Sequence, residues 1–137
     1  MRYVIATLAV VGIIVSSLAL HVHYSQDVEV CDINAHWDCG IVNHSRYAEI
    51  AHIPVAVIGI AGYAVLALLA MLRRNQLLAL LSILGLVFSL YLTHIEAKVL
   101  QIWCLYCVIS QALVLVIALL SSIVAVRQGT RASSTRA

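Results

Sequence analysis

Four long apolar stretches constrain this 137-residue chain more than any other feature. They cover residues 3–22, 53–72, 77–95 and 102–126, and each is close to the roughly 20 helical residues that cross a hydrocarbon core of about 30 Å. With 64% hydrophobic and only 10% charged residues, the composition excludes an ordinary soluble globule. The sequence therefore predicts an all-α integral membrane four-helix bundle, with an extracytoplasmic loop between the first and second helices.

The first stretch also has the features of a signal peptide, because Arg2 precedes it and Ser17, Leu18 and Ala19 loosely resemble a cleavage site. The apolar run is long for a signal sequence, however, and its removal would leave three spans with their ends on opposite sides. We therefore expect it to be retained as the first span, with cleavage as the alternative.

Basic residues near the span ends indicate the orientation. Six of them fall on one side of a four-span arrangement, and only Arg46 and Lys98 fall on the other. Both termini are therefore expected to be cytoplasmic, and the acidic residues, histidines and cysteines are expected in a compartment that permits disulfides. The six basic residues are Arg2, Arg73, Arg74, Arg127, Arg131 and Arg136.

The segments outside the spans differ in their expected order. Residues 23–52 form the only connection long enough to carry chemistry, and a short interfacial helix is expected around Ser45 to Ala51. Residues 127–137 have no apolar periodicity and are predicted to be a disordered cytoplasmic tail, which leaves residues 1–126 as the single domain. Within the spans, small residues predict close helix contacts. These are Gly12/Ser16, Gly59/Gly62 and Gly85/Ser89.

The four cysteines form two groups on the same expected side. Cys31 and Cys39 lie in the loop, whereas Cys104 and Cys107 form a Cys-x-x-Cys pair where the last apolar stretch begins. A helix start lowers cysteine pKa values, and positions i and i+3 share a face, so this second pair suits disulfide exchange. Inert bridges are the alternative. We expect no metal site, because the spacing of Cys31 and Cys39 and the scattered histidines fit no common ligand motif.

Four cysteines allow three pairings, and the sequence alone does not choose among them. Electron transfer between the loop pair and the helix pair requires a transient bond between them, and a bond between Cys39 and Cys104 is a natural intermediate. The chain has no nucleotide-binding loop or haem motif, so a lipid-soluble quinone is the expected electron acceptor. A quinone near Cys107 would need apolar walls and a few hydrogen-bond donors, which Asn43, Ser45 or a histidine could provide.

These residues together resemble the bacterial branch of the vitamin K epoxide reductase family over about residues 3–126. Cysteine order, spacing and span number all agree, whereas DsbB-type oxidases place their Cys-x-x-Cys in the first extracytoplasmic loop. The matching segments are Cys31-Asp32-Ile33-Asn34, Cys39-Gly40, Ser45, Ile53-Pro54-Val55-Ala56 with Gly59 and Tyr63, Phe88-Ser89-Leu90-Tyr91-Leu92, and Trp103-Cys104-Leu105-Tyr106-Cys107.

The resemblance implies a quinone-dependent thiol oxidase in the bacterial inner membrane. By position, Cys31 matches the shuttle cysteine that meets a thioredoxin-like (DsbA-like) partner, and Cys39 matches the cysteine that attacks Cys104. Cys107 matches the cysteine beside the quinone, and Ser45 matches the hydroxyl at the quinone site. The acceptor would be ubiquinone or menaquinone, and the activity would support disulfide bond formation in the periplasm.

Two departures from the family pattern shape the alternatives. The fourth residue after Cys107 is Gln111, where the animal enzymes have tyrosine, which argues against epoxide reduction. No thioredoxin-like domain follows the bundle, so the partner is expected to be a separate protein. The alternatives are a thiol-driven quinone or vitamin K epoxide reductase, and a non-catalytic membrane scaffold stapled by disulfides.

Two acidic residues have competing interpretations. Asp32 follows Cys31 directly, and loop capping and catalysis are about equally favoured for it. Glu96 and His94 end the third span, where they could relay a proton to a quinone. For both of these, we favour a solvated position at the membrane interface.

Overall fold

The computed structural model describes residues 1–25 and 31–136. The expected redox loop, residues 23–52, therefore includes a segment outside the described residues, which contains Asp27 and Glu29. The last residue of the expected tail, Ala137, also lies outside them.

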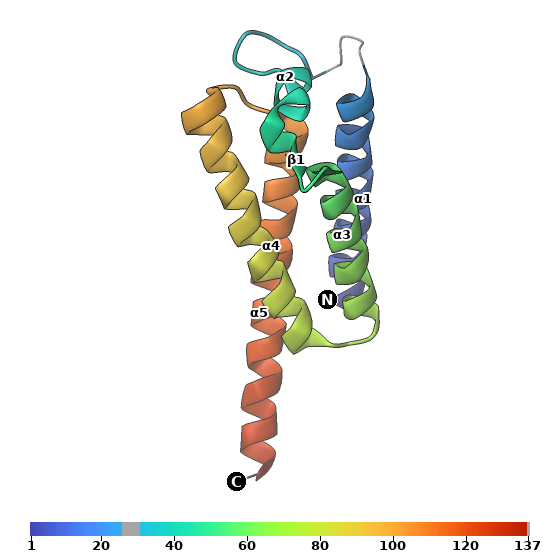
Figure 1. Cartoon of the computed structure of the whole chain (residues 1–137). Helices are drawn as coiled ribbons and strands as arrows, with labels where there is room; N and C mark the ends of the chain where they lie inside the picture. Colours follow the sequence, from blue (N-terminus) through green and yellow to red (C-terminus); the bar gives the residue numbers. More distant parts are fainter. Residues whose placement is uncertain (26–30, 137) are drawn as a thin grey trace.

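Four apolar helices run along the molecule (Figure 1). They are α1 (Arg2–Tyr24), α3 (Val55–Met71), α4 (Asn75–Ile95) and α5 (Leu105–Arg136). Among the described residues, α1, α4 with its extension to Leu100, and α5 are long and apolar enough to cross a membrane. The 17 residues of α3 give a shorter helix of about 25 Å at 1.5 Å per residue. The prediction of an all-α membrane helical bundle is confirmed.

The connection between α1 and α3 contains short elements of its own. Helix α2 (Cys39–His44) is followed by the 3₁₀ turn η1 (Arg46–Ala48) and by a hairpin of β1 (Glu49–Ile50) and β2 (Ile53–Pro54). The expected interfacial helix around residues 45–51 is therefore wrong, because the helical segment lies earlier in the chain.

Local chemistry explains this difference. Asp38 caps α2, since its Oδ1 accepts a hydrogen bond of 2.9 Å from the Ile41 N–H. Ala51 and His52 have φ values of 52° and 66°, which are the left-handed conformations of a two-residue hairpin turn. The second half of the expected helix is therefore a hairpin.

At the loop end of the bundle, α4 passes directly into η2, a π-helix over Glu96–Leu100 that ends at Gln101 with a φ of 55°. A π-helix has a wider turn than an α-helix and changes which side chains face inward. In η2, Glu96 is buried, whereas Lys98 is exposed.

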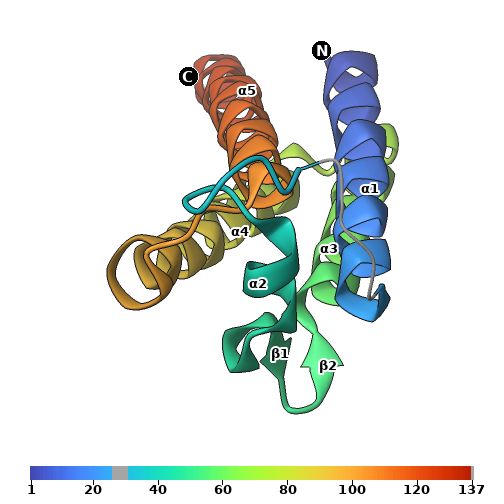
Figure 2. The ribbon, with the colours of Figure 1, turned by 90° about the horizontal axis from the view of Figure 1, so that it is seen from above.

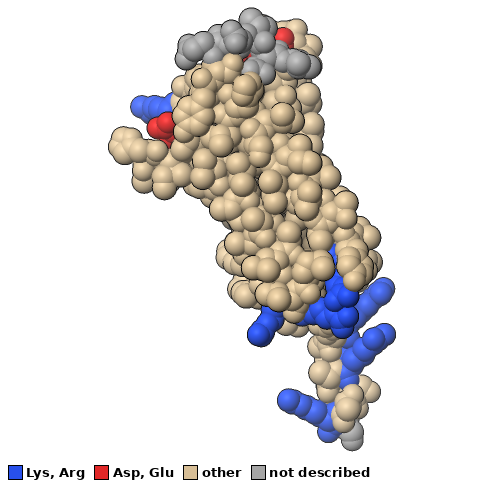
Figure 3. All heavy atoms as spheres, turned by 90° about the vertical axis from the view of Figure 1, so that its right-hand side faces the viewer, with Lys and Arg blue, Asp and Glu red and all other residues tan. Residues whose placement is uncertain are grey.

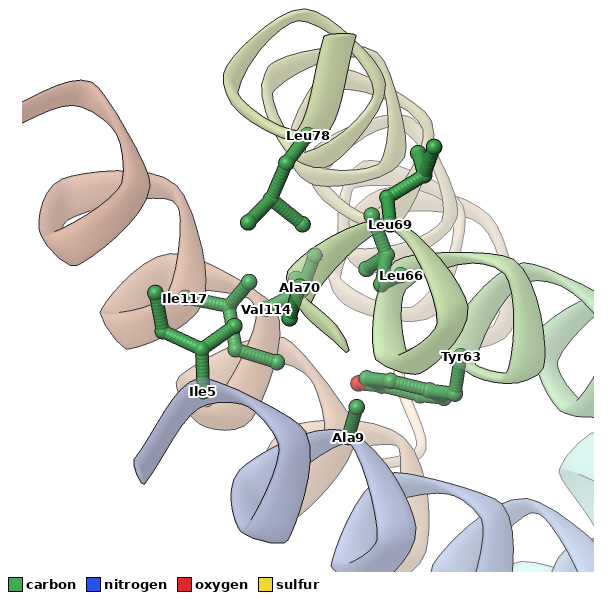
Figure 4. Packing of buried hydrophobic residues seen from close by; sticks show 9 residues of the cluster. All are labelled: Ile5, Ala9, Tyr63, Leu66, Leu69, Ala70, Leu78, Val114 and Ile117. Carbon is green, nitrogen blue, oxygen red and sulfur yellow. The ribbon is translucent and has the colours of Figure 1, made fainter. Parts of the chain in front are cut away.

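Helix α1 packs on α3 and α5, and α4 packs on α5. A close contact joins α1 to α3, because a Cβ on Gly12 would lie 2.4 Å from the Tyr63 ring, and one on Gly59 would lie 2.9 Å from Ser16 Oγ. A Cβ on Gly62, by contrast, would meet nothing within 4 Å, so the expected close contact is absent there. The core cluster around Tyr63, shown in Figure 4, consists of Ile5, Ala9, Tyr63, Leu66, Leu69, Ala70, Leu78, Val114 and Ile117.

Charged residues separate along the long axis of the molecule. Figure 3 shows most of the visible Lys and Arg side chains at the end that carries the two termini, whereas acidic side chains, with a smaller basic group beside them, lie near the loop end. This distribution matches the segregation of charge along the sequence. The side of the membrane on which each end lies is part of the functional proposal below.

The chain after residue 126 continues α5 as far as Arg136, so the expectation of a disordered tail is wrong. Thr130 and Thr135 each donate a side-chain hydrogen bond to the carbonyl four residues earlier, at 3.1 and 3.0 Å. The Ala, Arg and Gln residues of this segment favour helix, and the single Gly129 opposes it by only about 1 kcal/mol. The lack of apolar periodicity in this segment shows that it does not pack against the bundle. A helix that packs against nothing has the same sequence pattern as a disordered segment.

We expect Gly12→Ala to destabilise the bundle by about 1–3 kcal/mol, because the added methyl group overlaps the Tyr63 ring. Gly62→Ala is the matched control, since its methyl group meets no neighbouring atom. Thermal unfolding in detergent micelles measures both effects. Equal unfolding temperatures for the two variants would contradict the tight contact between α1 and α3.

Candidate functional site

The four cysteines lie together at the loop end of the bundle. Cys31 and Cys39 form a disulfide with an S–S distance of 2.06 Å, and Cys104 and Cys107 are free thiols. Cys104 Sγ lies 3.4 Å from Cys39 Sγ. Cys31 is 2% exposed, Cys39 and Cys104 are fully buried, and Cys107 is half-buried. The structure thus brings together all four residues predicted to be catalytic, and their individual roles stay predictions.

A backbone pairing holds the loop against the start of α5. Trp37 and Trp103 form a parallel bridge, and the N–H and the carbonyl of Trp103 each make a hydrogen bond to the loop, at 2.7 and 3.1 Å. The two indole rings lie 6.2 Å apart. Cys39 comes two residues after Trp37, and Cys104 directly follows Trp103, so the pairing places the two sulfurs side by side.

Asp32 fixes the other side of the loop pair. Its Oδ1 accepts a hydrogen bond of 3.2 Å from the Gly40 N–H. This bond ties the residue after Cys31 to the residue after Cys39. Of the two interpretations of Asp32, the geometry supports loop capping.

Asn43 joins α2 to both cysteine pairs. Its Nδ2 donates to the Cys39 carbonyl at 2.8 Å and to Cys104 Sγ at 3.6 Å. Its backbone carbonyl accepts from His23 Nδ1 of α1, and His23 Nε2 lies 3.1 Å from Glu49 Oε1. Asn43 borders the cavity, and its amide is hydrogen-bonded to Cys39 and Cys104. Its predicted contact with a quinone stays a prediction.

The surroundings of Cys104 favour its thiolate. Hydrogen bonding to the Cys107 thiol lowers the pKa of Cys104, and the Cys107 N–H at 3.4 Å and the Asn43 amide act in the same direction. Burial and the negative charge of Glu96 act against this shift. The net direction is downward, so a larger share of Cys104 is thiolate at neutral pH than for an ordinary thiol.

A cavity of about 620 Å³ lies between α3, α4 and α5, beside α2. Most of its surface is apolar, and Cys107, Asn43 and Ser45 are among the polar side chains that border it. Ser45 Oγ donates to the Val42 carbonyl at 2.8 Å, so its lone pairs remain available as acceptors. An apolar cavity with a few fixed polar groups suits a quinone ring and its apolar tail.

Glu96 belongs to this site, and the expectation of a solvated position for it is wrong. It is 4% exposed, its Oε2 accepts a hydrogen bond of 3.3 Å from the Cys104 N–H, and it also lines the cavity. The turn of η2 explains the burial, whereas the neighbouring His94 is exposed as expected. An acidic residue at the end of an apolar span is itself a signal for a functional site.

Sequence reasoning did not identify a second polar contact in the cavity wall. The Tyr63 hydroxyl donates to the Ser110 carbonyl at 2.7 Å, and both residues line the cavity. Thr93 also lines it and donates to the Gln111 side chain. The spacing of three residues between Cys107 and Ser110 on one helix was an available signal, because such residues share a face.

The histidines take no part in the cavity lining within the described residues. His44 Nδ1 instead bonds the Gly40 carbonyl at 2.7 Å within α2. In residues 1–25 and 31–136, no group of three His, Cys, Asp or Glu side chains forms a candidate metal site.

The fold and the site define a helical membrane protein with redox cysteines. The vitamin K epoxide reductase family matches residues 3–122, and the chain belongs to this family. No curated protein matches the sequence. Membership implies a membrane redox protein that acts as an oxidoreductase, and the cysteine arrangement indicates thiol chemistry.

We expect Asn43→Ala to raise the pH at which Cys104 is alkylated, because the variant loses a hydrogen-bond donor to the thiolate. Mass spectrometry of the reduced protein, alkylated over a pH series, measures this midpoint. Ser45→Ala is the control on the same segment, since the Ser45 hydroxyl bonds Val42 and not Cys104. An unchanged midpoint in Asn43→Ala would show that this contact does not stabilise the thiolate.

Proposed function

We propose that this protein oxidises the thiols of a separate thioredoxin-like (DsbA-like) protein and passes the electrons to a quinone, either ubiquinone or menaquinone. One observation carries the proposal: the sulfurs form a continuous route from the loop to the cavity. Cys104 lies against the loop disulfide at 3.4 Å from Cys39, and Cys107 lies on the cavity wall. The activity would support disulfide bond formation in the partner's compartment.

Two exchange reactions carry the electrons inward. The dithiol of the partner reduces the Cys31–Cys39 disulfide and becomes a disulfide itself. The Cys39 thiolate then attacks Cys104 in an oxidised Cys104–Cys107 pair, and Cys107 leaves. Cys31 next attacks Cys39 and releases Cys104. The products are a loop disulfide and two helix thiols, which is the arrangement in the structure.

The first reaction requires the loop to open. Cys31 is 2% exposed, so a protein thiol cannot reach its sulfur in the arrangement described here. The contacts that hold the loop include hydrogen bonds of the Trp103 backbone and of Asp32. The proposal requires these bonds to break and re-form in each reaction cycle.

The second half of the reaction takes place at the cavity. A bound quinone would accept two electrons and two protons from the helix pair. Cys107 would lie beside the quinone. Asn43, in α2, and Ser45, directly after α2, would border it. The apolar walls would exclude water from the thiols during transfer.

The distribution of basic residues supports an orientation. Arg2 begins α1, Arg73 and Arg74 join α3 to α4, and three arginines lie in the C-terminal part of α5, so all six belong to the end opposite the cysteines. By the positive-inside rule, this end is cytoplasmic. The proposal therefore places the protein in the bacterial inner membrane, with both termini cytoplasmic and the cysteines on the periplasmic side.

The geometry is less favourable to the two alternatives. A scaffold with two permanent bridges needs a Cys104–Cys107 disulfide, whereas both of these residues are free and Cys104 contacts the loop pair. For epoxide reduction, position 111 carries a glutamine that accepts a hydrogen bond from Thr93. Neither observation favours these functions over quinone-dependent thiol oxidation.

We expect Cys107→Ala to reduce quinol formation to background, because Cys104 alone cannot form the disulfide that provides two electrons. In the same variant, the Cys104 thiolate can attack Cys39 of the loop disulfide and release Cys31 as a thiol, so we expect a Cys39–Cys104 bond, visible by mass spectrometry without reductant. The double variant Cys31→Ala/Cys39→Ala is the control, since it retains the helix pair and should still reduce quinone with dithiothreitol as electron donor. A wild-type rate in Cys107→Ala would exclude the proposed route.

We expect Cys39→Ala to trap the partner on Cys31, because the variant lacks the cysteine that resolves the mixed disulfide. A purified thioredoxin-like protein in its disulfide form serves as the probe. The Cys31 thiolate attacks that disulfide, the second cysteine of the partner leaves as a thiol, and non-reducing electrophoresis detects the adduct. Cys31→Ala, compared under the same conditions, should give less adduct. An equal yield from the two variants would contradict the assignment of Cys31 as the partner-facing cysteine.

A further inference from the structure

We propose that Glu96 carries a proton between the helix pair and the quinone. Its carboxylate takes the proton of the Cys107 thiol as the Cys104–Cys107 disulfide forms, and it returns that proton to a quinone oxygen in the same cavity. This inference rests on the proposed function, because it assumes electron transfer from these thiols to a quinone. The cysteines provide the electrons for the transfer, and Glu96 is the group placed to move a proton with them.

The position of Glu96 supports this role. Its Oε2 accepts a hydrogen bond from the Cys104 N–H at 3.3 Å, and its side chain also interacts with the Cys107 side chain. Glu96 and Cys107 both line the cavity of about 620 Å³. One carboxyl group thus reaches both the thiol that releases a proton and the space in which the acceptor would lie.

The isolation of Glu96 also points to a role in the reaction. A carboxyl group that is 4% exposed loses most of its hydration, which is unfavourable unless a partner compensates. Among the described residues, no Lys, Arg or His forms an ion pair with Glu96, and His94 and Lys98 of the same segment are exposed. The titratable groups that contact it are Cys104 and Cys107. An unpaired acid in this position is suited to proton exchange with those thiols.

The protons and electrons of this step balance. Two thiols lose two electrons and two protons when they form a disulfide, and a quinone gains two electrons and two protons to become a quinol. One proton passes from Cys107 Sγ through the Glu96 carboxylate to a quinone oxygen. The Cys104 proton leaves to water, and water provides the second proton of the quinol.

Glu96→Gln separates proton transfer from positioning, because a glutamine oxygen still accepts the Cys104 N–H but does not carry a proton at neutral pH. We expect this variant to reduce quinone about 100-fold more slowly at neutral pH, which is the low end of general acid–base contributions. Its rate should rise with pH, because hydroxide replaces the missing base. Glu96→Asp retains a carboxylate and should be faster than Glu96→Gln.

A second measurement does not depend on quinone. In the reduced protein, the negative charge of Glu96 acts against ionisation of Cys104. Glu96→Gln should therefore move the alkylation of Cys104 to lower pH, even though quinone reduction becomes slower. Lys98→Gln is the matched control, since it removes an exposed charge from the same π-helix and should leave both measurements at wild-type values.

The outcomes distinguish this inference from the proposed function. Slower quinone reduction that recovers with pH, together with the alkylation shift, supports the relay. A wild-type rate of quinone reduction in Glu96→Gln overturns the relay. A rate loss by the same factor at every pH, with the alkylation of Cys104 unchanged, also overturns it, because that result indicates a positioning role only. Failure of the wild-type protein to reduce quinone contradicts the proposed function itself. If Glu96→Gln does not fold, Glu96→Asp decides. A partial loss of rate that recovers as the pH rises supports the relay, and a loss by the same factor at every pH overturns it.

Discussion

Hydrogen bonds on both sides of the Trp103 backbone hold the loop against the start of α5, and the arrangement of the sulfurs depends on them. They fix the register in which Trp37, two residues before Cys39, pairs with Trp103, the residue before Cys104. Each such bond contributes only about 0.5–1.5 kcal/mol net. This modest strength fits the opening of the loop that the proposed reaction requires. The same pairing therefore both assembles the site and permits it to open.

The bundle differs in character between its two ends. Towards the termini, the buried aliphatic cluster fills the interior (Figure 4). Small residues hold α1 close to α3 near the middle of the bundle, where Tyr63 also borders the cavity. Towards the loop, α3 stays with α1 while α4 stays with α5, and the cavity lies between these two pairs. Figure 2, viewed from the loop end, shows α2 between α4 and α3. The tightly packed end stabilises the fold, and the looser end provides room for a ligand beside Cys107.

Sequence reasoning predicted the features that depend on apolar length and on cysteine order. The four helices followed from hydrophobic runs, and the approach of Cys39 to Cys104 followed from the requirement for a bond between the pairs. The burial of Glu96 was missed because it depends on a π-helix, which no periodicity in the sequence indicates. The place of α2 depends on one cap at Asp38, and the helical tail depends on propensity without packing. The Tyr63–Ser110 contact requires two helices to be placed relative to each other, which the sequence does not specify.

The burial of the Cys31–Cys39 disulfide has a consequence for selectivity. An oxidised cysteine pair on a protein surface is open to attack by any small thiol in its surroundings. Here both sulfurs are covered, so a reductant must first displace the polypeptide above them. A small molecule binds too little surface to compensate for that displacement, whereas a folded protein with a complementary surface can do so. For the function proposed above, this burial would protect the loop disulfide from reduction by small thiols and leave it to a protein donor.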